Sequence, residues 1–131
     1  MEETELGPVS PMFIVGKLSE SVRFYTERLG FELRYSAPED EPFFAIVGRD
    51  SAQIFLKEIG KGVDPMPNPS RHEWAAWDGF VYVTEPERLA AEFESNGLEL
   101  TLPVSRREDG LRGFQISDAD GYVLYFGRPD P

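Results

Sequence analysis

Residues 13–33, FIVGKLSESVRFYTERLGFEL, and residues 80–100, FVYVTEPERLAAEFESNGLEL, share one pattern. In each stretch a short apolar run leads through a turn into an amphipathic segment, then to a glycine, then to a new apolar run. Phe80 follows Phe13 at a distance of 67 positions and is matched with it. Self-similarity at a fixed spacing indicates a duplicated supersecondary unit. Each copy is predicted to begin with a strand, a helix and a second strand.

The amphipathic segments are predicted to be helices. In the first copy, apolar residues such as Val22 and Tyr25 recur every three to four positions with charges between them, which is the period of one helix face. In the second copy, Pro86 suits the first position of a helix. Gly30 and Gly97 fall where a left-handed C-terminal cap is expected.

The second halves of the two copies also match, about 70 positions apart. Residues 44–46 (FAI) are matched with 114–116 (FQI), and residues 53–56 (QIFL) with 123–126 (VLYF). Between the last two apolar runs, residues 118–121 (DADG) are typical of a tight hairpin turn. The sequence therefore predicts an α+β fold of two tandem βαβββ modules.

The chain is predicted to be a single domain, 1–131, because its length suits one hydrophobic core. Module one is placed at residues 9–59 and module two at 77–128. Between them, residues 60–76 form the expected linker, in which three prolines fall within 65–69.

Strand alternation divides the apolar runs between a face covered by the helix and a free face. The residues predicted to lie under the helices are Ile54, Leu56, Val81, Val83, Leu124 and Phe126. The residues predicted to lie on the free faces are Gln53, Phe55, Lys57, Asp78, Phe80, Tyr82, Val123 and Tyr125. Large aromatic side chains on a free sheet face need a ligand, a partner or the other module to cover them.

Composition excludes several classes of function. The formal net charge is −11, with no cluster of Lys and Arg to neutralise phosphates, so nucleic acid is not an expected partner. Such a surface favours a cationic ligand, although acidity can also serve solubility alone. There is no cysteine, which excludes disulfides and thiolate metal sites. Without a long apolar run or a signal-like N-terminus, we expect no membrane partner and a cytoplasmic location.

Two motifs and the repeat itself carry a resemblance to a known family. Residues 15–33 (VGKLSESVRFYTERLGFEL) and 119–127 (ADGYVLYFG) are similar to motifs of the glyoxalase, bleomycin-resistance and extradiol dioxygenase superfamily, also called the vicinal oxygen chelate fold. The resemblance extends over residues 9–128. It implies that the paired modules form a curved mixed-sheet cleft lined by the free faces, usually within a homodimer.

Metal-dependent members of that family take His, Gln or Glu ligands from the first and fourth strands of each module. The resemblance carries these positions to Ser10 or a neighbour, Phe55, Asp78 and Tyr125. A divalent cation prefers three or more imidazole or carboxylate ligands, and of these four only Asp78 qualifies. The one imidazole, His72, is expected at the surface of the linker. We therefore expect no metal, no cofactor and a closest likeness to the metal-free bleomycin-resistance branch.

The function favoured by these features is metal-free binding of a small molecule, such as sequestration of a cationic aromatic antibiotic, with no catalytic residue assigned. Asp78 is expected to pair with an ammonium or guanidinium group of the ligand. The candidate ligand-binding residues are Met12, Gln53, Phe55, Trp74, Trp77, Asp78, Phe80, Tyr82, Phe114 and Tyr125.

Two other functions remain open. A metal-dependent lyase, isomerase or dioxygenase would require a different strand register, in which Glu58 is the one new carboxylate. A dimeric accessory domain would use the aromatic face for dimerisation alone. Trp74 and Trp77 suit a lid, a dimer contact or ordinary packing equally well. Residues 106–110 (RREDG) are expected to form a solvated loop, with Arg112 able to reach the cleft.

Overall fold

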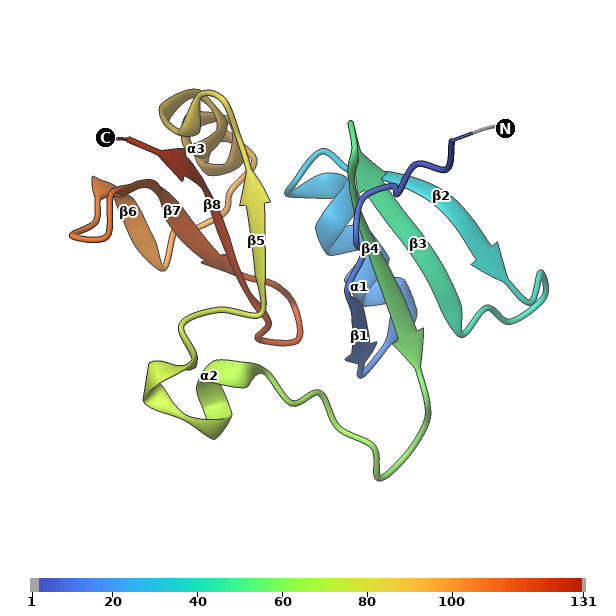
Figure 1. Cartoon of the computed structure of the whole chain (residues 1–131). Helices are drawn as coiled ribbons and strands as arrows, with labels where there is room; N and C mark the ends of the chain where they lie inside the picture. Colours follow the sequence, from blue (N-terminus) through green and yellow to red (C-terminus); the bar gives the residue numbers. More distant parts are fainter. Residues whose placement is uncertain (1–2, 131) are drawn as a thin grey trace.

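The chain forms two four-stranded sheets, each with one helix of ten residues on one face (Figure 1). The computed structural model describes residues 3–130. The first sheet has the order β1-β4-β3-β2 and the second has the order β5-β8-β7-β6. In the first sheet the strands are β1 (Met12–Val15), β2 (Glu32–Ala37), β3 (Phe44–Arg49) and β4 (Ala52–Glu58). In the second they are β5 (Gly79–Tyr82), β6 (Leu102–Arg106), β7 (Leu111–Ser117) and β8 (Val123–Pro129).

Both sheets are mixed. β1 runs parallel to β4, β5 runs parallel to β8, and the remaining neighbours are antiparallel. Each module therefore has the connectivity βαβββ, and the α+β fold with two tandem modules is confirmed.

The helices lie where the sequence places them. They are α1 (Leu18–Glu27) and α3 (Pro86–Ser95), and Pro86 is the first residue of α3. Gly30 and Gly97 have φ angles of 68° and 88°, the left-handed conformation that glycine adopts without a Cβ clash. The connection between the modules contains the short helix α2 (Asn68–Arg71) and the 3-10 turn η1 (Glu73–Ala75). None of the helices in the described part of the chain is long and apolar enough to cross a membrane.

The predicted division of the strands into two faces is confirmed. One buried apolar cluster extends through both modules and contains Ile54, Leu56, Leu124 and Phe126, with Val81 and Val83 packed against it. Each sheet therefore uses its helix-covered face for the core and leaves the other face free. Burial of about 25 cal/mol per Å² of apolar surface is the main term that stabilises such a core.

The residue-by-residue match of the first strands is wrong by one position. Met12 pairs with Phe55 in the first sheet, and Phe80 pairs with Tyr125 in the second. Met12 and Phe80 are therefore equivalent, 68 positions apart, and the counterpart of Phe13 is Val81. The helices also start 68 positions apart, so module one has one extra residue between its helix and Gly30.

The hairpins between the last two strands of each module differ by one residue as well. Arg49 pairs with Ala52 across a two-residue turn. In module two the Asp118 N–H donates to the Tyr122 carbonyl, so three residues lie between the paired positions. Tyr122 is therefore the counterpart of Ala52, and Asp118 is the counterpart of Arg49.

Candidate functional site

The free face of the first sheet carries a row of three aromatic rings, one from each of three neighbouring strands. The rings of Phe44 and Phe55 meet edge to face with centroids 5.6 Å apart, and those of Tyr35 and Phe44 lie 6.1 Å apart. Met12 lies beside Phe55 on β1 and is 54% exposed, while Tyr35 is 53% exposed. This face is therefore a solvent-accessible apolar surface that no other part of the described chain buries.

The free face of the second sheet carries a tighter aromatic stack. Tyr125 lies between Trp77, whose ring centroid is 4.8 Å away, and Phe80, whose centroid is 5.6 Å away. Trp77 and Phe80 themselves approach within 5.9 Å. Under these rings Tyr125 is fully buried, although it points away from the helix. The residue equivalent to Phe55 is thus already covered by neighbours from its own module.

A guanidinium group lies over this stack. The Arg107 side chain is 5.2 Å from the Trp77 ring centroid and 5.6 Å from that of Tyr125, within the range of a cation–π interaction. It also forms an ion pair with Asp109 at 3.1 Å. Arg112, the cation that the sequence suggested for the cleft, instead pairs with Glu87 on α3. Arg107 was missed because its loop was assigned to solvent, yet β7 neighbours β8 and the loop before β7 can reach Tyr125.

The Tyr125 hydroxyl has no hydrogen-bond partner among the described residues. Burial raises the pKa of Tyr125, and the nearby Arg107 acts in the opposite direction. The phenol is therefore neutral at physiological pH. An unpaired buried hydroxyl costs about 1–3 kcal/mol of stability.

Asp78 is not a free anion. Its Oδ1 accepts a hydrogen bond from the Asn68 N–H at 2.6 Å, and its Oδ2 accepts one from the Val123 N–H at 2.8 Å. The carboxylate thus fastens the start of α2 to the start of β8. The expected ion pair between Asp78 and a cationic ligand would have to compete with both backbone groups.

The side chains at the four metal-ligand positions do not fit a divalent cation. Phe55 has no donor atom, Tyr125 is a neutral phenol, Ser10 is a weak ligand and Asp78 is already engaged. Within residues 3–130, no group of three or more His, Cys, Asp or Glu could hold a metal ion.

Two of the candidate binding residues lie away from both ring clusters. Phe114 is fully buried against Phe93 and Phe126, on the helix side of β7, so its assignment to the cleft is wrong. Its pairing opposite Phe126, which lies under the helix, explains this burial, since paired residues share a face. Trp74 is 84% exposed and touches His72 in the linker.

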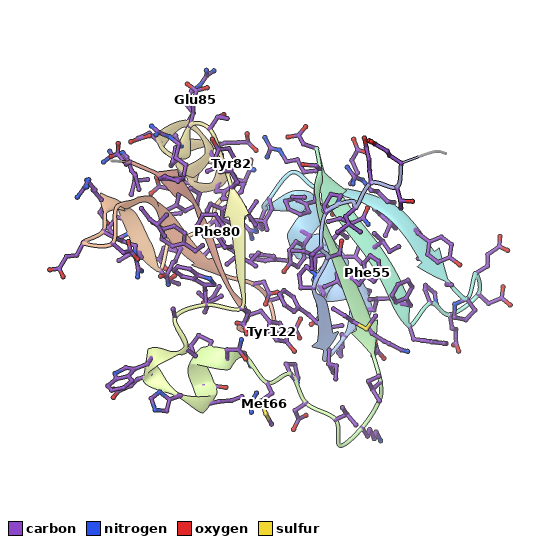
Figure 2. The ribbon with its side chains drawn as sticks, viewed as in Figure 1. Phe55, Met66, Phe80, Tyr82, Glu85 and Tyr122 are labelled. Atoms are coloured by element: carbon purple, nitrogen blue, oxygen red, sulfur yellow. The ribbon has the colours of Figure 1, made fainter. Side chains whose placement is uncertain are left out.

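The remaining candidates divide between the two modules. Met12, Gln53 and Phe55 belong to the first sheet, whereas Trp77, Phe80, Tyr82 and Tyr125 belong to the second or directly precede it. Figure 2 shows Phe55 on β4 and Phe80 on β5, in different modules. The structure thus presents two aromatic faces, and the predicted single cleft is not formed by one described chain alone.

Two of the contacts between the modules are made equivalent by the duplication. We call the contact of β1 and α1 with the β7–β8 turn the closed seam. There Tyr25 donates its hydroxyl to Asp118 at 2.6 Å, and Ser21 donates to Asp120 at 2.6 Å. Burial raises the pKa of Asp118 to about 6, although three hydrogen bonds to this carboxylate act in the opposite direction.

We call the contact of β5 and α3 with the β3–β4 turn the open seam. Arg49 forms a two-fold hydrogen-bonded ion pair with Glu92 there, at 2.7 and 3.0 Å. Two cavities open along this contact. One of about 830 Å³ lies between α3 and the β3–β4 turn, and one of about 450 Å³ lies beside β5, Ala52, Pro8, Val9 and Pro11.

Comparison with known proteins identifies the family of this chain. The family model of the glyoxalase/bleomycin resistance protein/dioxygenase superfamily matches residues 7–126. No curated protein sequence matches the chain.

Several solved structures share the fold at low sequence identity. A glyoxalase-related enzyme from Clostridium phytofermentans superposes with a TM-score of 0.74 at 16% identity, covering 98% of this chain and 99% of that one. TnmS3, an antibiotic-binding protein from Streptomyces sp. CB03234, gives a TM-score of 0.71 at 17% identity, covering 98% and 100%. UcmS2 gives 0.71 at 18% identity, covering 94% and 98%.

Proposed function

The chain belongs to the glyoxalase/bleomycin resistance protein/dioxygenase superfamily, and we propose that within it the protein binds a planar aromatic small molecule without the help of a metal ion. The observation that carries this proposal is the presence of rings, Phe55 and Tyr125, at equivalent positions on the two free sheet faces. Each ring is the centre of an aromatic cluster on a face that carries no helix. Concave, mostly apolar surfaces with a few polar groups are what small-molecule sites use.

The donor set supports binding over metal-assisted catalysis. An isomerase, lyase or dioxygenase of this superfamily would need a Lewis acid held by carboxylates or imidazoles. Phe55, and the rings of Trp77 and Phe80 that cover Tyr125, offer π surface instead, which stacks on flat ligands and adds about 0.5–1.5 kcal/mol per ring pair beyond area burial.

The local charges favour a neutral aromatic ligand with a hydrogen-bond acceptor over the cation expected from net charge. Arg107 places a positive group over the rings of module two, while Asp78 spends both oxygens on backbone N–H groups. The antibiotic-binding protein among the similar structures supports an antibiotic as the ligand class.

A homodimer would bring the two faces together. The exposed apolar side chains include Met12, Tyr35, Phe80 and Tyr82, which lie on the free faces of both sheets. In this proposal the module-one face of one protomer opposes the module-two face of its partner. The ligand would then stack between Phe55 and the Trp77–Tyr125 cluster.

Fluorescence titration tests the proposal directly. In a Trp74→Phe protein, Trp77 is the single emitter, and it already lies 4.8 Å from Tyr125. We expect acridone, a flat neutral ligand with a carbonyl acceptor, to quench Trp77 and to raise the melting temperature. Phe55→Ala and Trp77→Ala should each weaken binding about tenfold, because a stacking partner is lost. Binding to Trp77→Ala is read from the shift in melting temperature, because the emitting tryptophan is gone. Trp74→Phe alone is the matched control and should bind like the native protein.

Two results would contradict the proposal. A dimer that dissociates on Phe55→Ala, but responds to neither acridone nor bleomycin, would favour an accessory domain whose rings serve dimerisation. Stabilisation by nickel or manganese that is reversed by a chelator and by Asp78→Ala would favour a metal-dependent enzyme.

A further inference from the structure

Tyr122 fills the closed seam. Its ring stacks on Phe13 at 4.2 Å with an interplanar angle of 9°, and its hydroxyl donates to the Ile14 carbonyl at 2.6 Å. The Met66 N–H of the linker reaches the same hydroxyl at 3.4 Å. Figure 2 shows Tyr122 where the two modules meet, close to Met66. A tyrosine thus occupies the space between β1, β8 and the segment that leads into β5.

We call the space that the Tyr122 ring occupies its seat. The equivalent seat in the open seam lacks the counterpart of this ring. Ala52 stands at the position of Tyr122, and Val81 stands at the position of Phe13. Both line the cavity of about 450 Å³. Pro8, Val9 and Pro11 line it as well, so the segment leading into β1 takes the place that the linker has around Tyr122. The cavity is therefore the seat of a tyrosine side chain that this module lacks.

The seat also keeps a hydrogen-bond acceptor. The counterpart of Ile14, whose carbonyl receives the Tyr122 hydroxyl, is Tyr82. The Val83 N–H donates to Gly127 on β8, and neighbouring backbone groups of a strand point to opposite edges, so the Tyr82 carbonyl points to the free edge of β5. Backbone groups on an edge strand are open to pairing.

From this equivalence we infer that the cavity between Ala52 and β5 binds a phenolic ring. The ring takes the place of the missing tyrosine against Val81, and its hydroxyl donates to the Tyr82 carbonyl as Tyr122 donates to Ile14. The cavity of about 450 Å³ is larger than one tyrosine side chain, which leaves room for substituents. It adjoins Phe80 of the aromatic stack on the second sheet, so a larger ligand could extend from one to the other.

This inference rests on the proposed function in that it names the chemistry of one part of the ligand. The choice of a phenol as the ligand group follows from the closed seam of the same chain, where the phenol side chain of Tyr122 occupies the equivalent space. A group of the same shape without the O–H donor would fill the space but leave the carbonyl unpaired.

Calorimetric titration with phenol and anisole tests the inference on three proteins. We expect the native chain to bind one phenol, Ala52→Tyr to bind none because its own ring fills the seat, and Tyr122→Ala to bind two because a second seat is emptied. Anisole should bind the native chain at least about tenfold more weakly than phenol, because its methylated oxygen cannot donate. Ala52→Leu is a second filling variant, in case the tyrosine disturbs folding, and it should also abolish phenol binding.

Phenol binding that survives both Ala52 variants with an unchanged dissociation constant would overturn the inference, as would equal binding of anisole. If Tyr122→Ala does not fold, the native chain and the Ala52 variants still decide the question. The two proposals fail separately. Loss of the acridone response with phenol binding intact and sensitive to Ala52→Tyr contradicts only the proposed function, and the reverse pattern contradicts only the phenol seat.

Discussion

The closed seam and the open seam are built from equivalent elements but differ in nearly every side chain. The closed seam contains Tyr25, Asp118 and Tyr122, joined by short hydrogen bonds and a ring stack. At the equivalent positions the open seam has Phe93, Arg49 and Ala52. The large cavity and the smaller one both lie on the open seam.

This difference shows how a duplicated module can divide two tasks. When the hydrophobic core extends through both modules, one of the two equivalent seams is sufficient to hold the modules together. The second copy of the contact is then free to lose side-chain volume. Missing side-chain volume in a protein interior leaves a cavity unless the backbone collapses, and the cavity of about 450 Å³ beside Ala52 is such a space.

Removal of the Tyr122 ring should have the largest effect on stability. Tyr122→Ala empties a buried aromatic seat and leaves the Ile14 carbonyl without its donor, so we expect the free energy of unfolding to fall by about 3–5 kcal/mol. Tyr82→Ala is the control, since Tyr82 is 64% exposed and should cost less than about 1 kcal/mol. Urea denaturation measures both, and similar losses in the two variants would mean that Tyr122 does not close the seam.

The pH dependence of stability should report on Asp118. Burial raises the pKa of Asp118 to about 6 from 3.8, so the folded protein holds this proton more tightly than the unfolded chain. The resulting stabilisation is present at low pH and is lost as the pH rises through about 6. Relative to Asp118→Asn, the free energy of unfolding of the native protein should fall by up to about 3 kcal/mol between roughly pH 4 and pH 7. Parallel curves for the two proteins would show that Asp118 titrates normally.

The ion pair of the open seam should contribute least. The Arg49 and Glu92 side chains are 33% and 41% exposed, so solvent screens their attraction. A double-mutant cycle with Arg49→Met and Glu92→Gln should give a coupling below about 1 kcal/mol, and it should weaken in high salt. A salt-independent coupling as large as the loss of stability in Tyr122→Ala would contradict the expectation that the open seam contributes less to stability than the closed seam.

Periodicity was sufficient to predict the modules and their faces. The alternation in residues 79–83 and 123–127 places Val81, Val83 and Leu124 under the helix, as observed. Periodicity could not determine which residue of module one corresponds to which residue of module two. One extra residue before Gly30 and one in the β7–β8 turn shift the match between strands, and neither changes the local pattern of the chain.

The site was harder to predict because its contacts are distant in the sequence. The rings of Phe55 and Tyr125 follow from strand register, but Arg107 over Tyr125 depends on how a hairpin loop folds back. The engagement of Asp78 by Asn68 and Val123 depends on the path of the linker. The two seams were not visible at all, because they arise from packing between modules.

The position of Asp78 also limits how the protein could change over evolution. Its two oxygens already hold the N–H groups that join α2 to β8. Carboxylates or imidazoles introduced in place of Phe55 and Tyr125 would therefore meet a third group that cannot turn toward a cation without releasing the linker. A metal site at these positions would therefore require the connection between the modules to be rebuilt as well.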